Sequence, residues 1–192
     1  PVERTGDLLF THRGLSGPAA LDLSGEVAAL LRERPTVPLR ATLTGGVTAQ
    51  EWTACLDGWR ASHGRKLLRS LVAESLPNSV AQRLCEQAAI PEDLRASYIG
   101  RTQRAALAAI LAETPFTIRA TEGFERAMVT RGGVELKQVD PRTLASRLLP
   151  GLFFAGEILD LDGPCGGFNL QWAFSSGHLA GLASTREGSF CY

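Results

Sequence analysis

The chain has 192 residues, 44% of them hydrophobic, which is enough to bury a sizeable core in one large domain or two small ones. Twenty basic residues balance twenty acidic ones, so no net field favours nucleic acid or an anionic membrane, and we expect neither as a partner. No uninterrupted apolar run approaches the roughly 20 residues that span a bilayer, so we expect a soluble, cytoplasmic protein. Because the sequence begins with Pro1 and within a motif, we also expect a piece of a longer polypeptide.

The first predicted strand, Leu8 to Thr11, leads into a loop that is rich in glycine. A helix is expected over residues 19–23, with Ser16 as a candidate cap. The loop Gly14–Pro18 resembles a nucleophile elbow, but proline stands where Gly-x-Ser-x-Gly requires its last glycine, which disfavours a serine hydrolase.

His12 and Arg13 stand at the end of that strand. We regard them as candidates for contacting an anionic substrate or a cofactor phosphate, and an exposed loop pair is the alternative.

The next elements are a strand and a capped helix. Residues 37–43 alternate between apolar and other side chains, which predicts a half-buried strand that lies at an edge or starts at its proline. Thr48 and Glu51 form a capping box, and Trp52 and Trp59 follow at helical spacing. Both tryptophans are therefore expected in a core.

Residues 66–113 are predicted to be helical, with breaks at Pro77, Pro91 and Gly100. A hairpin is expected next, in which a strand from Phe116 to Ala120 turns into a second strand over residues 124–130. The basic residues of the helical stretch are scattered among acidic ones, which favours a solvated face.

The C-terminal region predicts a strand, a turn and a helix. An apolar run from Gly151 stops at Gly156 and Glu157, and a helix opens at Gly166 and Gly167. Free N–H groups at a helix start, next to residues without Cβ, allow an electron-rich ligand edge to come close.

The same helix carries small residues on one side. Ala173, Gly177 and Gly181, with Ser176 and Ala180 beside them, form a smooth stripe that can lie tightly on a sheet. Close packing for reasons of fold alone is an equally good explanation of the glycine pattern.

The cysteines are widely spaced and form no Cys-x-x-Cys motif; they are Cys55, Cys85, Cys165 and Cys191. With only three histidines to join them, they predict no metal site, and reduced thiols are the simplest interpretation. Cys165 precedes the glycine pair at the predicted helix start, a position that suits a reactive thiol. A small turn residue is the alternative, favoured because no resolving cysteine lies nearby in sequence.

Three segments carry a resemblance to a known family. Residues 151–160 followed by 166–177 resemble the C-terminal flavin-binding signature of a bacterial FAD-dependent oxidoreductase family with aminoacetone oxidase-like and bile-acid reductase-like members. Residues 124–134 resemble the family's Val-Thr-x-Gly-Gly-Val segment, and residues 9–18 supply a third match in the expected order.

The resemblance implies an α+β fold: a substrate domain of strands and helices with a helical subdomain, plus a C-terminal strand-turn-helix that completes a Rossmann-like FAD-binding domain. The implied domains are residues 1–65, part of a strand-rich substrate or insertion domain; 66–114, the helical subdomain; 115–150, a return hairpin toward the flavin domain; and 151–192, the C-terminal segment of the FAD-binding domain. No Gly-x-Gly-x-x-Gly follows any strand, so only half of an FAD site is expected, and the missing N-terminal FAD-binding part of the polypeptide is the implied partner.

By position, the resemblance also implies functional residues. Glu157 matches the acidic residue near the ribityl chain, and Asp160 accompanies it. The implied cofactor-binding residues beside the flavin ring are Gly166, Gly167, Phe168, Asn169, Thr130, Gly132 and Gly133. Phe168 stands where tyrosine is more usual, which removes a hydroxyl.

The implied activity is hydride transfer between NAD(P)H or an organic small-molecule substrate and the flavin, with no catalytic residue identified. His12 and Arg13 are the candidates for substrate binding, and no metal is implied. A non-catalytic binding or scaffolding domain that retains the flavoprotein fold is the contrasting interpretation.

Overall fold

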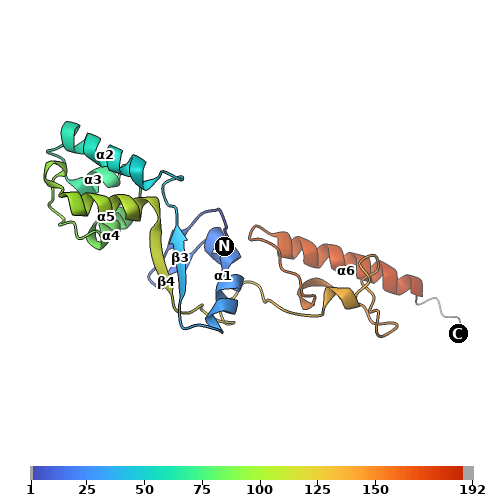
Figure 1. Ribbon diagram of the computed structural model, residues 1–192. Coiled ribbons are helices and arrows are strands. Elements are labelled where there is room, and N and C mark those ends of the chain that lie inside the picture. The colour runs from blue at the N-terminus through green and yellow to red at the C-terminus, as the bar shows by residue number, and fades with distance from the viewer. Residues whose placement is uncertain (1, 188–192) are drawn as a thin grey trace. The chain divides into compact units, whose positions relative to one another are not determined.

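The computed structural model describes residues 2–187 (Figure 1). The chain divides into two compact units. The split unit combines Pro1–Pro35 with Arg119–Tyr192, and the helical unit is the intervening segment Thr36–Ile118. The chain therefore leaves the split unit, builds the helical unit and returns.

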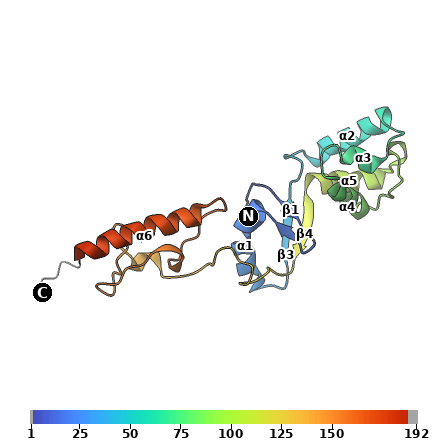
Figure 2. The same ribbon diagram turned by 180° about the vertical axis from the view of Figure 1, so that it is seen from behind.

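The helical unit consists of four helices, a short 3₁₀ turn and two strands: β3 (Val37–Ala41), α2 (Ala49–Ser62), α3 (Leu68–Val72), α4 (Asn78–Gln87), η1 (Ala96–Tyr98), α5 (Arg101–Ala112) and β4 (Thr114–Ile118). The strands β3 and β4 pair in antiparallel register, with Val37 opposite Ile118 (Figure 2). The breaks fall near Pro77, Pro91 and Gly100, as the sequence predicts: Pro77 and Gly100 are the N-cap residues of α4 and α5, and Pro91 follows the end of α4 at Gln87.

Local signals and burial together explain the start of this unit. The Thr48 hydroxyl accepts from the Glu51 N–H, and the Glu51 carboxylate accepts from the Thr48 N–H, so the predicted capping box is confirmed. Such a cap stabilises a helix by about 1 kcal/mol. Trp52 and Trp59 pack edge to face with ring centroids 6.1 Å apart. The leucines that are fully buried around them are Leu56, Leu68, Leu71, Leu107 and Leu111.

The split unit has fewer regular elements: β1 (Leu9–Phe10), β2 (Leu15–Ser16), α1 (Pro18–Leu31), the 3₁₀ turns η2 (Leu136–Gln138) and η3 (Gly156–Ile158), and α6 (Phe168–Glu187). A small core of Val139, Leu144, Leu159 and Ala180 lies beneath α6 and η3. The whole chain is thus a mixture of helices and short strands, as predicted at the level of fold class. Within the described residues, no helix is long and apolar enough to cross a membrane.

The predicted hairpin over residues 116–130 is wrong. The strand β4 ends at Ile118 and pairs with β3, and the chain then turns at Gly123, whose carbonyl accepts from the Ala127 N–H. No strand forms over residues 124–130. Alternating side chains identify a strand, but they do not identify its partner, and here the partner lies far upstream.

The predicted strand before Gly156 is also absent. Phe153 makes only an isolated bridge with Ala145, and η3 follows at Gly156. A strand needs a continuous ladder of hydrogen bonds to a neighbouring strand, and within the described residues this segment makes only the single bridge to Ala145. At the other end of the unit, Ser16 lies within β2 and does not cap α1, because Gly17 occupies the N-cap position with no side-chain bond.

The small-residue stripe of α6 does not pack as expected. A side chain at Gly177 or Gly181 would meet nothing within 4 Å. Ser176 and Ala180, the small residues beside these glycines, are buried, as is Ala183. Among the described residues, the glycine side of α6 therefore has no packing partner.

Candidate functional site

Two of the sequence motifs meet through backbone hydrogen bonds. The Val134 N–H donates to the Ile158 carbonyl at 2.8 Å, and the Asp160 N–H donates to the Val134 carbonyl at 3.0 Å. These bonds make an isolated parallel bridge between Val134 and Leu159. The structure thus brings the double-glycine loop alongside η3.

Gly133 is the residue that permits this approach. A Cβ at this position would lie 2.3 Å from the Ile158 carbonyl oxygen and 2.8 Å from the Leu159 carbonyl carbon. Contacts this short do not occur, so any side chain would push the loop away from η3. Gly132 differs, because it has a φ of +97° and open space beside it. Gly133 therefore allows the loop to approach η3 closely, and Gly132 allows the backbone to turn with a positive φ.

Glu157 is exposed and bonded to the double-glycine loop. Its Oε1 accepts from the Thr130 N–H at 2.6 Å and from the Thr130 hydroxyl at 2.5 Å. These bonds, the hydroxyl first, hold the pKa of the Glu157 carboxyl below its ordinary value, because they favour the charged form. Both described bonds use Oε1, which leaves Oε2 as an acceptor. Asp160 is exposed nearby and contributes its backbone to the bridge.

The second glycine pair immediately precedes α6. Gly166 and Gly167 have φ values of +124° and +91°, and a side chain at Gly167 would meet nothing within 4 Å. Phe168, the first residue of α6, is 59% exposed. The N-terminus of a 20-residue helix is thereby approachable from solvent past a residue without Cβ.

Asn169 holds the loop that leads to this helix start. Its Oδ1 accepts from the Gly163 N–H at 2.7 Å, and its Nδ2 donates to the Gly163 carbonyl at 2.9 Å. The side chain thus closes the turn between Gly163 and α6. Its amide is committed to the loop, so it acts by fixing the glycine pair in place.

Ser176 and Trp172 connect α6 to η3, although neither is among the functional residues predicted from the sequence. The Gly156 N–H donates to the Ser176 hydroxyl at 2.8 Å, and the Trp172 indole N–H donates to the Gly156 carbonyl at 3.2 Å. Ser176 is 1% exposed. A serine in an otherwise apolar helix face indicates a buried hydrogen bond. Here that bond connects α6 with η3.

His12 and Arg13 are not brought into contact with the glycine loops. Arg13 forms an ion pair with Glu122 at 3.1 Å, and its Nε donates to His12 at 3.4 Å. The charge of Arg13 is therefore already offset, which weakens the case for an anion site at this loop. The alternative of an exposed loop pair describes their surroundings better.

The three cysteines in the described part of the chain are free thiols. Cys85 lies in the helical core, where burial raises the pKa of its thiol to about 11. Cys165 is exposed, and its N–H donates to the Asp22 carboxylate at 2.6 Å, which makes it a turn residue tied to α1. Cys191 lies outside the described residues. No cluster of metal-binding side chains is found within residues 2–187.

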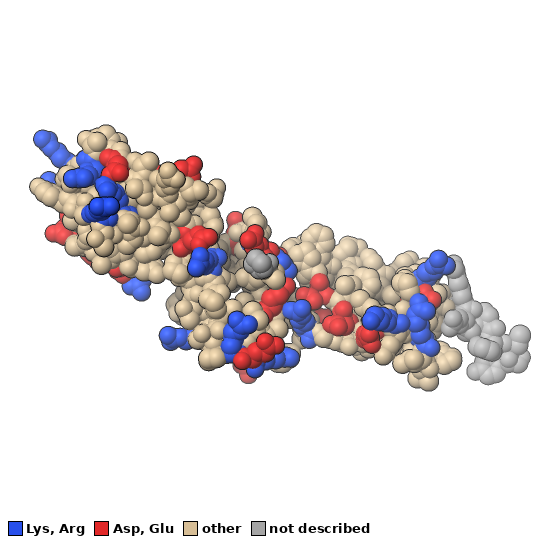
Figure 3. Space-filling view, in the orientation of Figure 1, with Lys and Arg blue, Asp and Glu red and all other residues tan. Residues whose placement is uncertain are grey.

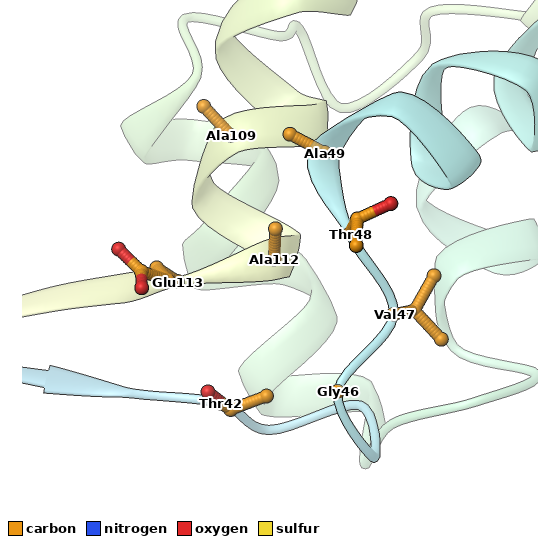
Figure 4. Close-up of a pocket in the computed structure, with 8 residues that line it drawn as sticks. All are labelled: Thr42, Gly46, Val47, Thr48, Ala49, Ala109, Ala112 and Glu113. Atoms are coloured by element: carbon orange, nitrogen blue, oxygen red, sulfur yellow. The ribbon is translucent and has the colours of Figure 1, made fainter.

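A separate hollow of about 410 Å³ lies in the helical unit, between the start of α2 and the end of α5 (Figure 4). Small side chains such as Ala49, Ala109 and Ala112 line it. Its acidic group, Glu113, pairs with Arg40 at 2.8 Å. None of the residues predicted from the motifs lies in this hollow, so it is not the site that they form.

Comparison with known proteins decides the family. The model of the HI0933-like protein Rossmann domain matches residues 21–183. The chain belongs to this family. The bacterial FAD-dependent oxidoreductase family inferred from the motifs is thereby confirmed.

Three curated relatives cover nearly the whole chain. It is similar to the ribosomal RNA dihydrouridine synthases of Haemophilus influenzae (32% identical over 180 residues, 94% of this chain and 42% of the relative) and of Escherichia coli (35% over 175 residues, 88% and 40%). It is also similar to the 3-dehydro-bile acid delta(4,6)-reductase of Clostridium scindens (32% over 186 residues, 97% and 46%). The chain spans less than half the length of each of these relatives.

Proposed function

We propose that this chain is the C-terminal portion of an FAD-dependent oxidoreductase and that it forms one side of the flavin site. One observation carries the proposal. The loop at Gly132 and Gly133 is bonded to η3, and η3 is bonded to α6 through Ser176, so separate glycine motifs form one connected structure. Gly132 and Gly167 both leave open space where a side chain would stand.

The residues present fit a flavin. Glu157 is held by Thr130 through Oε1, and its Oε2 is available to accept from ribityl hydroxyls. The free N–H groups at the start of α6 suit an electron-rich edge of the ring, and Gly167 leaves room for it. Phe168 would add apolar contact without a hydroxyl, and Asp160 would line the same edge.

The reaction that we propose is the reduction of a carbon–carbon double bond. Two of the relatives' names share this chemistry, because making dihydrouridine and reducing a delta(4,6) compound each add hydrogen across such a bond. Bound FAD would pass two electrons from NAD(P)H to the substrate, which gains a hydride and a proton. The chain's own residues would position and hold the cofactor.

We also propose that the missing N-terminal part of the polypeptide covers α6 and completes the site. The exposed large apolar side chains of α6 in the described part of the chain are Phe168, Leu170, Phe174 and Leu182. Gly177 and Gly181 stand with open space on the same helix, which suits close packing against a sheet. A helix that exposes this much apolar surface is suited to being covered.

The experiment compares Glu157→Gln with the unaltered full-length protein. The change should weaken FAD binding by roughly 1 to 2 kcal/mol, the difference between a charge-assisted and a neutral hydrogen bond. The melting temperature of the apo form should change little, because the side chain is exposed. Glu135→Gln is the matched control, since Glu135 is also an exposed carboxylate of the split unit. Unchanged flavin affinity together with a lower apo melting temperature would assign Glu157 to stability alone.

A further inference from the structure

Two stretches of the helical unit contain basic residues and no acidic ones. Residues 58–73 hold Arg60, Arg65, Lys66 and Arg69, and residues 94–112 hold Arg95, Arg101 and Arg104. Neither stretch contains Asp or Glu, although the chain as a whole has equal numbers of acidic and basic residues. Charge in this unit is therefore segregated along the sequence.

The fold places these two stretches against each other. The Leu68 N–H donates to the Leu94 carbonyl at 2.9 Å, the Ala96 N–H donates to the Lys66 carbonyl at 3.0 Å, and the Ser97 N–H donates to the Gly64 carbonyl at 3.1 Å. The C-terminal end of α2, the loop before α3, η1 and the start of α5 thus form one surface, which we call the basic tip. Figure 3 shows Lys and Arg gathered on the end of the helical unit away from β3 and β4.

Four arginines of the basic tip have no acidic partner within the described residues: Arg60, Arg65, Arg95 and Arg101 are exposed and make no ion pair there. Of the other basic residues, Arg104 binds Asp57 and Lys66 binds Glu74. The half-buried Arg69 makes no ion pair within the described residues. Asp93, the acidic residue closest in sequence to Arg95, makes no ion pair with it within the described residues. The unpaired guanidinium groups are available for an external anion.

An aromatic side chain stands among these cations. Tyr98 is 74% exposed, and its N–H donates to the Arg95 carbonyl at 3.0 Å, so it belongs to the same turn. A large exposed ring in a charged surface is costly for solubility and offers a flat face for stacking.

We propose that the basic tip binds single-stranded RNA, with the four arginines on phosphates and Tyr98 stacked on a base. A guanidinium group can donate two parallel hydrogen bonds to the oxygens of one phosphate. Proteins that bind single-stranded nucleic acid combine such basic groups with aromatic rings on which unpaired bases stack. A membrane surface fits less well, because Tyr98 is the only large apolar side chain exposed among the described residues 58–73 and 94–101. The net charge of zero predicts no nucleic-acid partner, but a net charge does not say where the charges lie on the surface.

This inference rests on the proposed function, since it names RNA as the class of substrate on which the flavin chemistry would act. It assigns substrate capture to the helical unit and cofactor binding to the split unit. The two roles can therefore be tested separately.

The test measures the anisotropy of a fluorescein-labelled single-stranded RNA of about 15 nucleotides when the 192-residue chain is added. The tip variant combines Arg65→Ala with Arg95→Ala. The control combines Arg40→Ala with Arg83→Ala, which removes the same charge from two exposed arginines that pair with acidic side chains elsewhere in the unit. Equal net charge in the two variants isolates the position of the arginines.

Each phosphate contact on a single strand contributes about 0.7 to the slope of log affinity against log salt concentration. The tip variant loses two contacts, or about 1.4 in that slope, so at 0.1 M salt, about tenfold below a 1 M reference, it should bind about 25-fold more weakly. The control should keep its affinity. Tyr98→Leu should weaken binding by about tenfold, and Tyr98→Phe should retain it, because the ring does the stacking.

Three results would overturn the inference: no RNA binding by the unaltered chain, equal losses in the tip variant and the control, or binding to phosphatidylglycerol vesicles in place of RNA. In the full-length protein, the tip variant should keep its full FAD content. A protein without FAD would refute the proposed function, whereas a flavoprotein that does not bind RNA at the tip would refute only this inference.

Discussion

Gly133→Ala should separate the double-glycine loop from η3. The new methyl group would lie 2.3 Å from the Ile158 carbonyl oxygen, so the loop must move by about 1 Å to restore an ordinary contact. That movement breaks the bonds from Val134 to Ile158 and from Asp160 to Val134. At about 1 kcal/mol for each bond, the local structure should lose about 2 kcal/mol.

Hydrogen exchange measured at the Val134 and Asp160 amides reports this loss directly. A local destabilisation of about 2 kcal/mol corresponds to roughly thirtyfold faster exchange at both amides. Gly181→Ala is the control in the same unit, because its side chain would stand in open space within a helix. There alanine should stabilise the helix by up to about 1 kcal/mol. Unchanged protection of both amides in Gly133→Ala would refute the argument that the two motifs are held together by this close approach.

Three further predictions concern single residues. Gly167→Val should lower the FAD content of the full-length protein, because the new side chain fills the open space before α6. Its φ of +91°, which valine rarely adopts, should also destabilise the protein by about 1 to 3 kcal/mol, and full flavin occupancy would remove Gly167 from the site. The lowered pKa of Glu157 means that its contact with Thr130 persists above the ordinary carboxyl pKa and is lost only as pH falls through the lowered value. The Thr130 amide proton shift, followed by NMR, should titrate there, and a midpoint at or above the ordinary value would contradict the contact. Iodoacetamide at pH 8 should modify Cys165 well before Cys85, whose pKa of about 11 and burial leave little thiolate, and mass spectrometry showing equal rates would disagree.

Features fixed by neighbouring residues could be read from the sequence. The Thr48 capping box, the breaks near Pro77 and Pro91, and the strand predicted over residues 37–43 and found over 37–41 all depend on signals within a few positions. In each case the chemistry of one or two side chains limits the backbone, whatever the rest of the chain does.

Features that depend on distant partners could not be read in this way. The strand β4 pairs with β3 across the whole helical unit, and no local pattern distinguishes that partner from the segment after Gly123. In the site, the motifs indicated Thr130 and Glu157 separately, but their hydrogen bond became visible only in the fold. The same holds for Asn169, whose amide closes a loop rather than facing outward.

The central claim is that this chain forms one side of a flavin site, and the visible absorption spectrum of the purified full-length protein tests it most directly. We expect a yellow protein that contains about one FAD per chain and that loses its visible flavin band when NADH or NADPH is added without oxygen. A colourless, well-folded full-length protein that takes up no FAD would contradict the claim and would favour a non-catalytic binding or scaffolding role.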